Sequence, residues 1–441
     1  FTLLCCYKEE KMINPEIGFT SDVIKNPDRF VGRTDLIRNC IRALNAPLGL
    51  IGIYGKRGVG KSSLARQIQQ IAVGNLVTIK NSGLDHEAPK SMRKYITVYY
   101  QCDSMISNVE DLIRRLLNDQ NEEDGLLRLV PNDGKEIVEF QRSDEINGGV
   151  DLKVLSWGAK GVDTSKYAKV VENDNIQTFR NFLSAIVTHQ VKKKMKREGL
   201  LIIIDEFDVV KDKVGMGSLI KSLSSDEVKF AVCGIGDDLF ELVEDHGSVE
   251  RLLEEGTLHV TPMPVNESEE IIKKAERLFK GDMNFVSDVI TEIAELSQGY
   301  PYLVQLIGKE SVNKANQLNS NLIDRHIFNQ VKKEIASGKA FPTLERQYLR
   351  AVGDSEDRKN LLYILANQEE DKTMFDTEVG KLVLKKARRD AESFEVKHID
   401  QLLPRLIDPK FGPALRKVPD MKGYYEFVNP VFRVYCQLRE L

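Results

Sequence analysis

Apolar and polar positions follow two different patterns along the chain, and the pattern changes near residue 265. Before it, short apolar runs typical of buried strands alternate with segments in which apolar residues recur at helical spacing. The runs lie at residues 49–54, 95–101, 200–204, 230–234 and 258–260. This alternation indicates an α/β domain, so we expect a parallel sheet with helices on both faces.

Farther along the chain the strand-like runs stop and helical patterns dominate. Asn266 and Glu269 have the spacing of a capping box at the start of the first helix. A later helix ends at Gly299, and Pro301 begins the next one at a position where its missing N–H costs nothing. These patterns predict a small all-α lid domain over residues 265–340.

The C-terminal segment, residues 341–441, combines helical patterns with a short ribbon. Two strand candidates, at 415–418 and 424–428, are joined through a turn that contains Pro419 and Gly423. They follow predicted helices at 344–352, 358–367, 378–389 and 396–407. Helices followed by a two-stranded ribbon predict a winged-helix domain.

A fixed motif lies between the first predicted strand and the helix after it. Residues 55–62 read Gly-Lys-Arg-Gly-Val-Gly-Lys-Ser, which fits the P-loop pattern G-x-x-x-x-G-K-[ST] at every fixed position. Glycines let the backbone turn tightly and direct N–H groups at phosphate oxygens, and the following helix adds the positive end of its dipole. The motif predicts binding of a nucleoside triphosphate, with contacts from Gly55, Gly58, Val59, Gly60, Lys61, Ser62 and Ser63.

The P-loop motif and one apolar run predict which side chains act in catalysis and metal binding. Lys61 is expected to reach the β and γ phosphates, and the Ser62 hydroxyl to ligate Mg²⁺. The apolar run 200–204 ends abruptly in Asp205 and Glu206, which a buried strand would deliver to the carboxyl edge of the sheet. There Asp205 suits Mg²⁺ binding, and Glu206 suits positioning and deprotonating the attacking water. Taken alone the pair would be a solvated strand end, but the upstream P-loop favours the catalytic interpretation.

Composition excludes several other classes of protein. Lys and Arg number 63 against 67 Asp and Glu in 441 residues, so the net charge of −4 gives no overall positive field for nucleic acid or an acidic membrane. The six cysteines form no C-x-x-C pair, which indicates neither a zinc site nor a disulfide framework. No apolar stretch has the length of a membrane span, and residues 1–6 are too short for a signal-peptide core. We therefore expect a cytoplasmic protein with no membrane partner.

The predicted domains are an N-terminal tail (1–25), a nucleotide-binding domain (26–264), the lid and the winged helix. Residues 118–175 are interpreted as an insertion, in which Trp157 lies in a Gly-bearing stretch compatible with a hairpin. The basic run at 192–197 fits either a nucleic-acid patch or a solvated helix end closed by Gly199. The helix end is favoured, because cations stabilise the C-terminus of a helix.

The P-loop, the acidic pair and the trailing modules together resemble AAA+ P-loop ATPases, in particular the origin-recognition-like and STAND-like branch. The resemblance covers residues 26–441, and two more motifs carry it. Phe30-Val31-Gly32-Arg33 is similar to the "VGR" box, which implies that Val31, Gly32 and Arg33 lie against the adenine and ribose. Gly299-Tyr300-Pro301 is similar to the G-x-P element of STAND lids, which implies that Pro301 packs on the base.

The resemblance also implies two residues that act on the γ-phosphate. Asp237 follows the strand that carries sensor 1 in this family, and Arg251 falls where the family places an arginine finger that acts on a neighbouring subunit's ATP. Arg251 equally suits pairing with Glu250 or Glu254 on its own helix. The lid helix that carries the AAA+ sensor 2 arginine has no arginine here, so slow turnover is expected.

Three further points bear on the resemblance. Arg33 also fits an ordinary surface arginine before a helix. His398-Ile399-Asp400 is similar to the element with which STAND winged helices hold ADP, although its spacing favours a histidine on a helix surface. A GTPase is disfavoured because no N-K-x-D element appears after the sheet strands.

These expectations predict an ATPase with ATP/ADP and Mg²⁺ as ligands that works as a switch. Nucleotide would favour one arrangement of lid and winged helix, and so control assembly of a homo-oligomer or engagement of an effector protein. The alternative is a DNA-binding protein of replication-initiator or mobile-element type. Its winged helix would contact duplex DNA through Lys397, Arg405, Arg416, Lys417 and Lys422, beside a basic run at 381–389. A third possibility is a nucleotide-binding scaffold with little catalysis.

Overall fold

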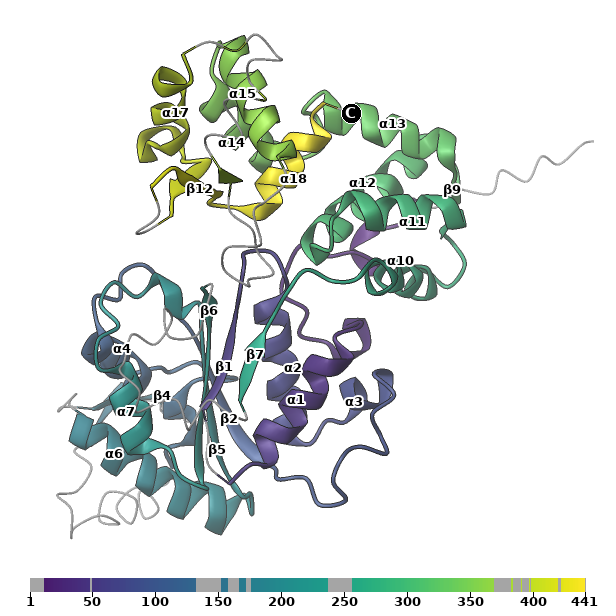
Figure 1. The fold of residues 1–441 in the computed structure, drawn as a ribbon. Helices are drawn as coiled ribbons and strands as arrows, with labels where there is room; N and C mark the ends of the chain where they lie inside the picture. The colour runs from purple at the N-terminus through teal and green to yellow at the C-terminus, as the bar shows by residue number, and fades with distance from the viewer. Residues whose placement is uncertain are drawn as a thin grey trace, which may run out of the picture. The chain divides into compact units, whose positions relative to one another are not determined.

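The fold is seen in a computed structural model of the chain (Figure 1). It describes residues 12–47, 50–131, 152–157, 166–171, 176–236, 256–368, 382–383, 390, 396, 398–418 and 422–440. The chain forms two compact units. The sheet unit holds Val23–Gly55 and Lys61–Val260, and the helical unit holds residues up to Asp22, Lys56–Gly60 and Thr261–Leu441.

A parallel sheet is the centre of the sheet unit. Its five strands are ordered β2-β5-β6-β1-β7, and all neighbours run parallel. The strands are β1 (Leu50–Gly55), β2 (Tyr95–Gln101), β5 (Gly199–Asp205), β6 (Val228–Ile235) and β7 (Thr257–His259), so all five predicted runs are confirmed. Every residue of β5 is buried between β2 and β6, which explains a strand sequence without polar interruption.

Helices cover both faces of this sheet, as the alternating pattern predicts (Figure 1). One face carries α1 (Thr34–Asn45), α2 (Lys61–Val73) and α3 (Val77–Asn81), with η2 (Pro27–Arg29) before α1. The other carries α4 (Val109–Leu117), α6 (Ile176–Ala185), the π-helix η4 (Ile186–Lys194) and α7 (Met216–Leu223); η5 (Phe207–Val209) follows β5. On this second face Phe182 and Ile220 pack with Ile202 of β5 in one apolar core. The predicted P-loop NTPase fold class is confirmed.

The region predicted as an insertion has two different parts. Its first residues contribute to the core of the sheet unit, because Leu126, Leu127 and Leu129 of η3 (Leu126–Leu129) are buried in the same apolar cluster. Farther along, β3 (Leu152–Trp157) and β4 (Lys166–Val171) pair antiparallel, which confirms the hairpin. The polar residues 118–125, which open the region, therefore form a loop between α4 and η3, beside this core.

The basic run at 192–197 is at a helix end, as predicted, because η4 ends at Lys194. Gly199 does not close that helix, however. It is the first residue of β5, and the positive φ of 50° after the helix belongs to Lys196.

The lid part of the helical unit is built from helices and a minimal parallel ladder. Its elements are η1 (Pro15–Ile17), α10 (Val265–Phe279), β8 (Asn284–Phe285), α11 (Ser287–Leu296), α12 (Pro301–Gln317), β9 (Leu322–Ile323) and α13 (Arg325–Ala336). The fully buried ring of Phe19 contacts the rings of Phe279 and Phe285, with centroids 6.1 and 5.9 Å away. This part of the predicted N-terminal tail is thus packed into the lid.

The capping box predicted at Asn266 is wrong. Helix α10 begins at Val265 after Pro264, and no side chain caps it, so Asn266 lies inside the first turn. Glu269 instead accepts a hydrogen bond from the Thr291 hydroxyl of α11 at 2.8 Å. The Glu269 carboxylate thus makes a tertiary contact between α10 and α11 instead of the capping hydrogen bond that the local pattern predicted.

The C-terminal part contains α14 (Pro342–Val352), α15 (Glu356–Asn367), α17 (Ile399–Ile407), η6 (Pro409–Phe411) and α18 (Pro430–Leu438). The predicted ribbon is confirmed, because β11 (Leu415–Lys417) and β12 (Tyr424–Phe427) pair antiparallel. The helix predicted at 378–389 is wrong where the structure describes it. Leu382–Val383 is a strand, β10, which pairs with β12 and makes a three-stranded sheet, β10-β12-β11.

Two absences concern the part of the chain that the structure describes. No helix there is both long and apolar enough to cross a bilayer. Its cysteines, Cys40, Cys102, Cys233 and Cys436, are buried free thiols.

Candidate functional site

The P-loop glycines have the backbone conformations that the motif requires. Strand β1 ends at Gly55 and helix α2 begins at Lys61. Gly55, Gly58 and Gly60 have φ values of 145°, 84° and 98°, which residues with a Cβ atom rarely adopt. A Cβ on Gly55 would also lie 2.2 Å from the Val260 carbonyl oxygen. The turn from strand to helix is therefore available only to glycine at these positions.

The two carboxylates after β5 have very different surroundings. Asp205 is only 3% exposed, whereas Glu206 is exposed and has a left-handed backbone with φ 54°. The Asp205 Oδ1 atom accepts the N–H of Glu206 at 2.9 Å. Left-handed non-glycine residues are costly and often occur at functional sites. The acidic pair is thus one buried, fixed carboxylate and one that reaches solvent.

Gln101, the last residue of β2, is a site residue that the sequence pattern did not reveal. Its side-chain Nε2 donates to Glu206 Oε2 at 3.1 Å. Parallel register places Gln101 opposite Asp205, so the end of β2 lies beside the end of β5. A glutamine at the end of a strand has no distinguishing local pattern, and only the sheet order identifies its partner.

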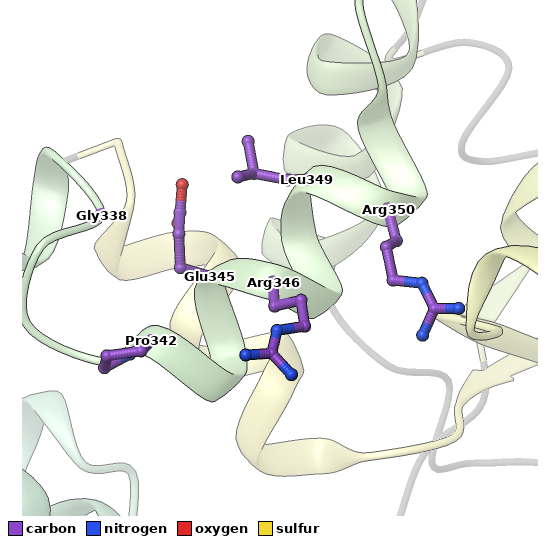
Figure 2. A pocket seen from close by; sticks show the side chains of 6 residues that line it. All are labelled: Gly338, Pro342, Glu345, Arg346, Leu349 and Arg350. Carbon is purple, nitrogen blue, oxygen red and sulfur yellow. The ribbon is translucent and has the colours of Figure 1, made fainter.

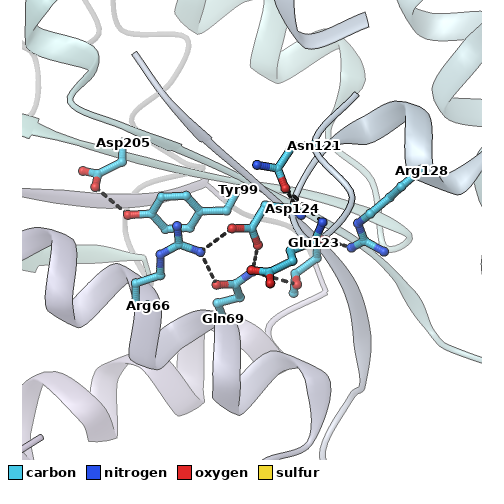
Figure 3. Close-up of polar contacts among 9 residues, drawn as sticks. Arg66, Gln69, Tyr99, Asn121, Glu123, Asp124, Arg128 and Asp205 are labelled. Carbon is cyan, nitrogen blue, oxygen red and sulfur yellow. Dashed lines mark hydrogen bonds and ion pairs between the residues drawn. The ribbon is translucent and has the colours of Figure 1, made fainter. Parts of the chain in front are cut away.

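Asp205 also has a buried neighbour on β2. The Tyr99 hydroxyl donates to Asp205 Oδ2 at 2.5 Å, as Figure 3 shows. Burial, and then the charge of Asp205, raise the pKa of Tyr99 above its usual range, so the phenol stays protonated and can donate. Sequence reasoning missed this residue, because Tyr99 is one of several apolar or aromatic residues in the run.

The charges of Lys61 and Asp205 both act on the buried thiol of Cys233 on β6. Burial raises the pKa of the Cys233 thiol well above its usual range, and the charge of Asp205 adds to this effect. The Lys61 ammonium acts on the same thiol in the opposite direction. The predicted phosphate-binding lysine and the predicted metal-binding aspartate therefore lie near one buried point of the sheet unit.

The oxygen atoms available here fit Mg²⁺. The Asp205 carboxylate accepts from the Tyr99 hydroxyl, the Glu206 N–H and the Cys233 thiol, which leaves about one of its four lone pairs for a metal. The half-buried Ser62 adds a hydroxyl at the start of α2, which packs on β5. Among the described residues no group of three or more His, Cys, Asp or Glu forms a metal cluster. Mg²⁺ needs none, because it usually keeps waters and substrate phosphates with one or two protein oxygens.

The predicted nucleoside-binding segment lies before α1. Gly32 and Arg33 have consecutive positive φ values of 68° and 62°, and Arg33 is the residue before the helix. Val31 and Gly32 are partly buried, while Arg33 is 8% exposed, so the interpretation of Arg33 as a surface residue is wrong. The Ser63 hydroxyl accepts the Ile24 N–H at 3.0 Å and so attaches this segment to α2. Ser63 therefore has a structural contact beside its predicted role.

Within the helical unit, residues 56–60 of the P-loop have partners from the lid and the C-terminal part. The Cγ of Pro301, the first residue of α12, would lie 4.0 Å from a Cβ on Gly60. A Cβ on Gly58 would meet Val431 at 2.5 Å. Pro301 is thus close to the phosphate-binding loop, as its predicted role in nucleotide binding requires.

Lys56 of the same loop donates to Glu426 Oε2 of β12 at 2.9 Å, and both side chains are buried. Arg416 of β11 donates to the other oxygen of Glu426 at 2.5 Å. The remaining predicted residues, Asp237 and Arg251, lie outside the described residues. So do Lys397 and most of the basic run at 381–389.

A shallow pocket of about 510 Å³ lies elsewhere in the helical unit, around α14 (Figure 2). Arg346 and Arg350 extend from this helix, and Leu349 is exposed beside them. The carboxylate of Glu345, which also lines the pocket, accepts hydrogen bonds from Tyr435 and Arg439. None of the predicted site residues lines this pocket.

The sequence matches the profile of one known family, described as Novel STAND NTPase 1, over residues 19–306. This match spans more than half of the 441 residues. The chain belongs to this STAND NTPase family. The family assignment agrees with the P-loop and the acidic strand end, and makes the protein a nucleotide-binding NTPase. No curated protein matches the sequence.

Several solved structures are similar in fold to this STAND NTPase. A Walker-type ATPase of Pyrococcus abyssi has 16% identity and a TM-score of 0.47, covering 92% of this chain and 96% of that one. Cdc6p from Pyrobaculum aerophilum has 13% identity and a TM-score of 0.40, with coverage of 97% and 98%. The Aeropyrum pernix Orc1 protein in complex with DNA has 12% identity and a TM-score of 0.41, with coverage of 95% and 93%. At such identities none of them assigns a partner to this chain.

Replacing Lys61 by alanine should remove most nucleotide affinity, because the ammonium neutralises phosphate charge next to the α2 N-terminus. We expect binding of a fluorescent ATP analogue to weaken by at least about 100-fold, the effect of losing a charged hydrogen bond of roughly 3 kcal/mol. Lys80→Ala, at an exposed lysine of α3, is the matched control. Unchanged affinity in Lys61→Ala would contradict the P-loop assignment.

Proposed function

We propose that this NTPase is a slow, Mg²⁺-dependent ATPase in which nucleotide state controls engagement of a partner protein or of further copies of the chain. The observation that carries the switch is the ion pair between Lys56 of the phosphate loop and the buried Glu426 of β12. Pro301 of α12, in the lid, lies next to Gly60 of the same loop. A change in the phosphates bound by the loop would therefore act directly on contacts of the lid and of β12.

The chemistry follows from the residues at the carboxyl edge of the sheet. Lys61 and the loop amides bind the phosphates, and Asp205 and Ser62 would hold Mg²⁺. When bound, Mg²⁺ neutralises charge on the phosphate oxygens and aligns them for in-line attack. Glu206, exposed and next to the buried Asp205, orients the attacking water and accepts its proton. Gln101 donates a hydrogen bond to the Glu206 carboxylate and so limits the orientations that this carboxylate can adopt.

Contacts of Glu426 support coupling to the C-terminal part. Its carboxylate is buried and receives Lys56 from the P-loop and Arg416 from β11. A buried charge that loses its partner is costly, so movement of Lys56 toward a bound phosphate would leave Glu426 undercompensated. Nucleotide binding and the position of β12 would then depend on each other, as a switch requires.

Glu206→Gln should retain ATP affinity and suppress turnover, because glutamine cannot accept the proton of the attacking water. We expect phosphate release to fall by about 100-fold or more, with ATP binding within twofold (roughly) of the parent protein. Glu110→Gln, an exposed glutamate of α4, serves as the control. Undiminished phosphate release in Glu206→Gln would exclude Glu206 as the base, and the absence of hydrolysis in the parent protein would favour a nucleotide-binding scaffold.

Glu426→Gln should free Lys56 for the bound phosphates, because a neutral amide holds its ammonium less strongly than a carboxylate does. We expect release of a fluorescent ADP analogue to become about tenfold slower, which corresponds to about 1.4 kcal/mol. Glu295→Gln, at an exposed glutamate of α11 in the same unit, is the matched control. Equal release rates in Glu426→Gln and the parent protein would remove the support for coupling through this contact.

Binding of duplex DNA is the alternative function, favoured by exposed cations on the ribbon. Lys417 of β11 and Lys422 in the turn before β12 are exposed. Arg405, by contrast, lies 3.9 Å above the Phe411 ring and donates to the Arg350 carbonyl at 3.3 Å, so it is less available than the sequence indicated.

A fluorescence anisotropy titration with duplex DNA over a range of salt concentrations separates the two functions. If the ribbon contacts phosphates, the double substitution of Lys417 and Lys422 by alanine should reduce the slope of log K against log salt by about 2. We expect no salt-dependent binding if the switch acts on proteins alone. Binding that ATP strengthens and salt steeply weakens would favour the DNA function instead.

A further inference from the structure

Four side chains of the sheet unit form a continuous path behind the metal-binding carboxylate (Figure 3). They come from four segments that the sequence separates: Arg66 from α2, Tyr99 from β2, Asp205 from β5 and Asp124 from the polar loop after α4. The roles predicted for these segments do not explain why the four side chains are linked. The loop at 118–125, between α4 and η3, lies in the region predicted as an insertion and contains none of the predicted nucleotide-binding residues.

The first link fixes the orientation of Asp205. Tyr99 is 5% exposed, and its hydroxyl donates to Oδ2 of Asp205 at 2.5 Å, while Oδ1 accepts the Glu206 N–H at 2.9 Å. The Cys233 thiol also hydrogen-bonds to this carboxylate, so three donors favour one orientation and leave about one of its four lone pairs for a metal. A buried carboxylate without such donors would be costly.

The second link holds the tyrosine ring. The Arg66 guanidinium carbon lies 3.3 Å above the centre of the Tyr99 ring, and its Nη1 donates to Asp124 Oδ2 at 2.7 Å and to Gln69 Oε1 at 2.9 Å. Gln69 in turn donates to the other oxygen of Asp124 at 2.7 Å. Arginine stacked on a ring and paired with a partly buried carboxylate has little rotational freedom.

The third link attaches the path to the polar loop. The N–H groups of Glu123 and Asp124 both donate to Asn121 Oδ1 at 2.9 Å, and the Tyr99 N–H donates to the Asp124 carbonyl at 3.0 Å. β2 is the edge strand of the sheet, so the loop satisfies a backbone group that would otherwise be open. The loop therefore fixes Tyr99 twice, through its backbone and through Arg66.

We propose that Tyr99 is a positioning residue for the Mg²⁺-binding carboxylate of Asp205, and that Arg66 and Asp124 hold its ring in place. The inference rests on the proposed function, because it takes Asp205 as a metal-binding residue. It assigns a role to the loop at 118–125, since displacement of Asp124 would release Arg66 and then Tyr99. The loop thereby becomes a point from which metal binding can be weakened without any contact to the nucleotide.

Metal binding to the full chain loaded with ADP tests the proposal, with Mn²⁺ as the probe and free Mn²⁺ measured by electron paramagnetic resonance. Tyr99→Phe removes only the hydroxyl, and we expect Mn²⁺ affinity to fall by about tenfold, the lower range for loss of a partner behind a metal ligand. Tyr95→Phe is the matched control, because that buried hydroxyl on the same strand donates to the Leu44 carbonyl at 2.8 Å instead. ADP affinity without metal should stay unchanged in both variants.

Asp205→Asn separates failure of this inference from failure of the proposed function. If the parent protein and Asp205→Asn bind Mn²⁺ equally, Asp205 is not a metal-binding residue and the proposed function fails at that point. If Asp205→Asn loses affinity while Tyr99→Phe binds as the parent does, the positioning role of Tyr99 is overturned. Loss of metal-free ADP affinity in Tyr99→Phe would equally overturn it, since that result indicates a general structural role.

Asp124→Asn keeps the test informative if Tyr99→Phe does not fold. This partly exposed side chain touches neither Asp205 nor the P-loop in the described contacts, and asparagine retains a hydrogen-bonding group for Gln69. We expect a smaller loss of Mn²⁺ affinity, about threefold, since a neutral amide holds Arg66 less tightly. Mn²⁺ affinity equal to that of the parent protein would contradict the role of the loop.

Discussion

Parallel pairing of β1, β2, β5 and β6 is the constraint on which the site depends. Strands that run in the same direction end at one edge of the sheet, where ligands of α/β proteins bind. In this register Gln101 lies opposite Asp205, and Gly55 lies opposite Ile235. The strand ends that carry Gly55, the acidic pair and Gln101 therefore lie at one edge of the sheet although the chain separates them widely. A shift of one residue in any of these strands would turn the side chains to the opposite face.

Burial of a carboxylate at that edge has consequences for its surroundings. Asp205 can stay in the interior because donors from Tyr99 and from its own neighbour's backbone satisfy both oxygens. Its charge raises the pKa of the nearby thiols of Cys102 and Cys233, in addition to the larger effect of burial, and keeps them neutral. Glu206 takes a left-handed backbone to leave the strand and reach solvent. The same few residues thus provide one buried acidic group and one that is exposed to solvent.

The helical unit repeats this principle with a different carboxylate. Glu426 is buried on β12 and is satisfied by two cations, one from the P-loop and one from β11. Buried charge pairs contribute little to net stability but are costly to break, so they suit a contact that changes with a ligand. In the proposed switch, phosphate charge would compete with Glu426 for Lys56, and this competition would couple nucleotide binding to the C-terminal part.

Local chemistry determined much of this protein from the sequence alone. The five strands, the glycines of the P-loop and the acidic end of β5 were predictable, because burial on both faces and positive φ each restrict which residues a position accepts. Short-range patterns failed where tertiary contacts compete: Glu269 bonds to Thr291 instead of capping its helix, and Leu382–Val383 pairs with β12 instead of continuing a helical pattern. Arg33 is buried, which its place before a helix did not reveal. The partners of Asp205 and Glu206, namely Tyr99 and Gln101, were decided only by the order and register of the strands, since a hydrogen bond between distant residues has no signature in either segment.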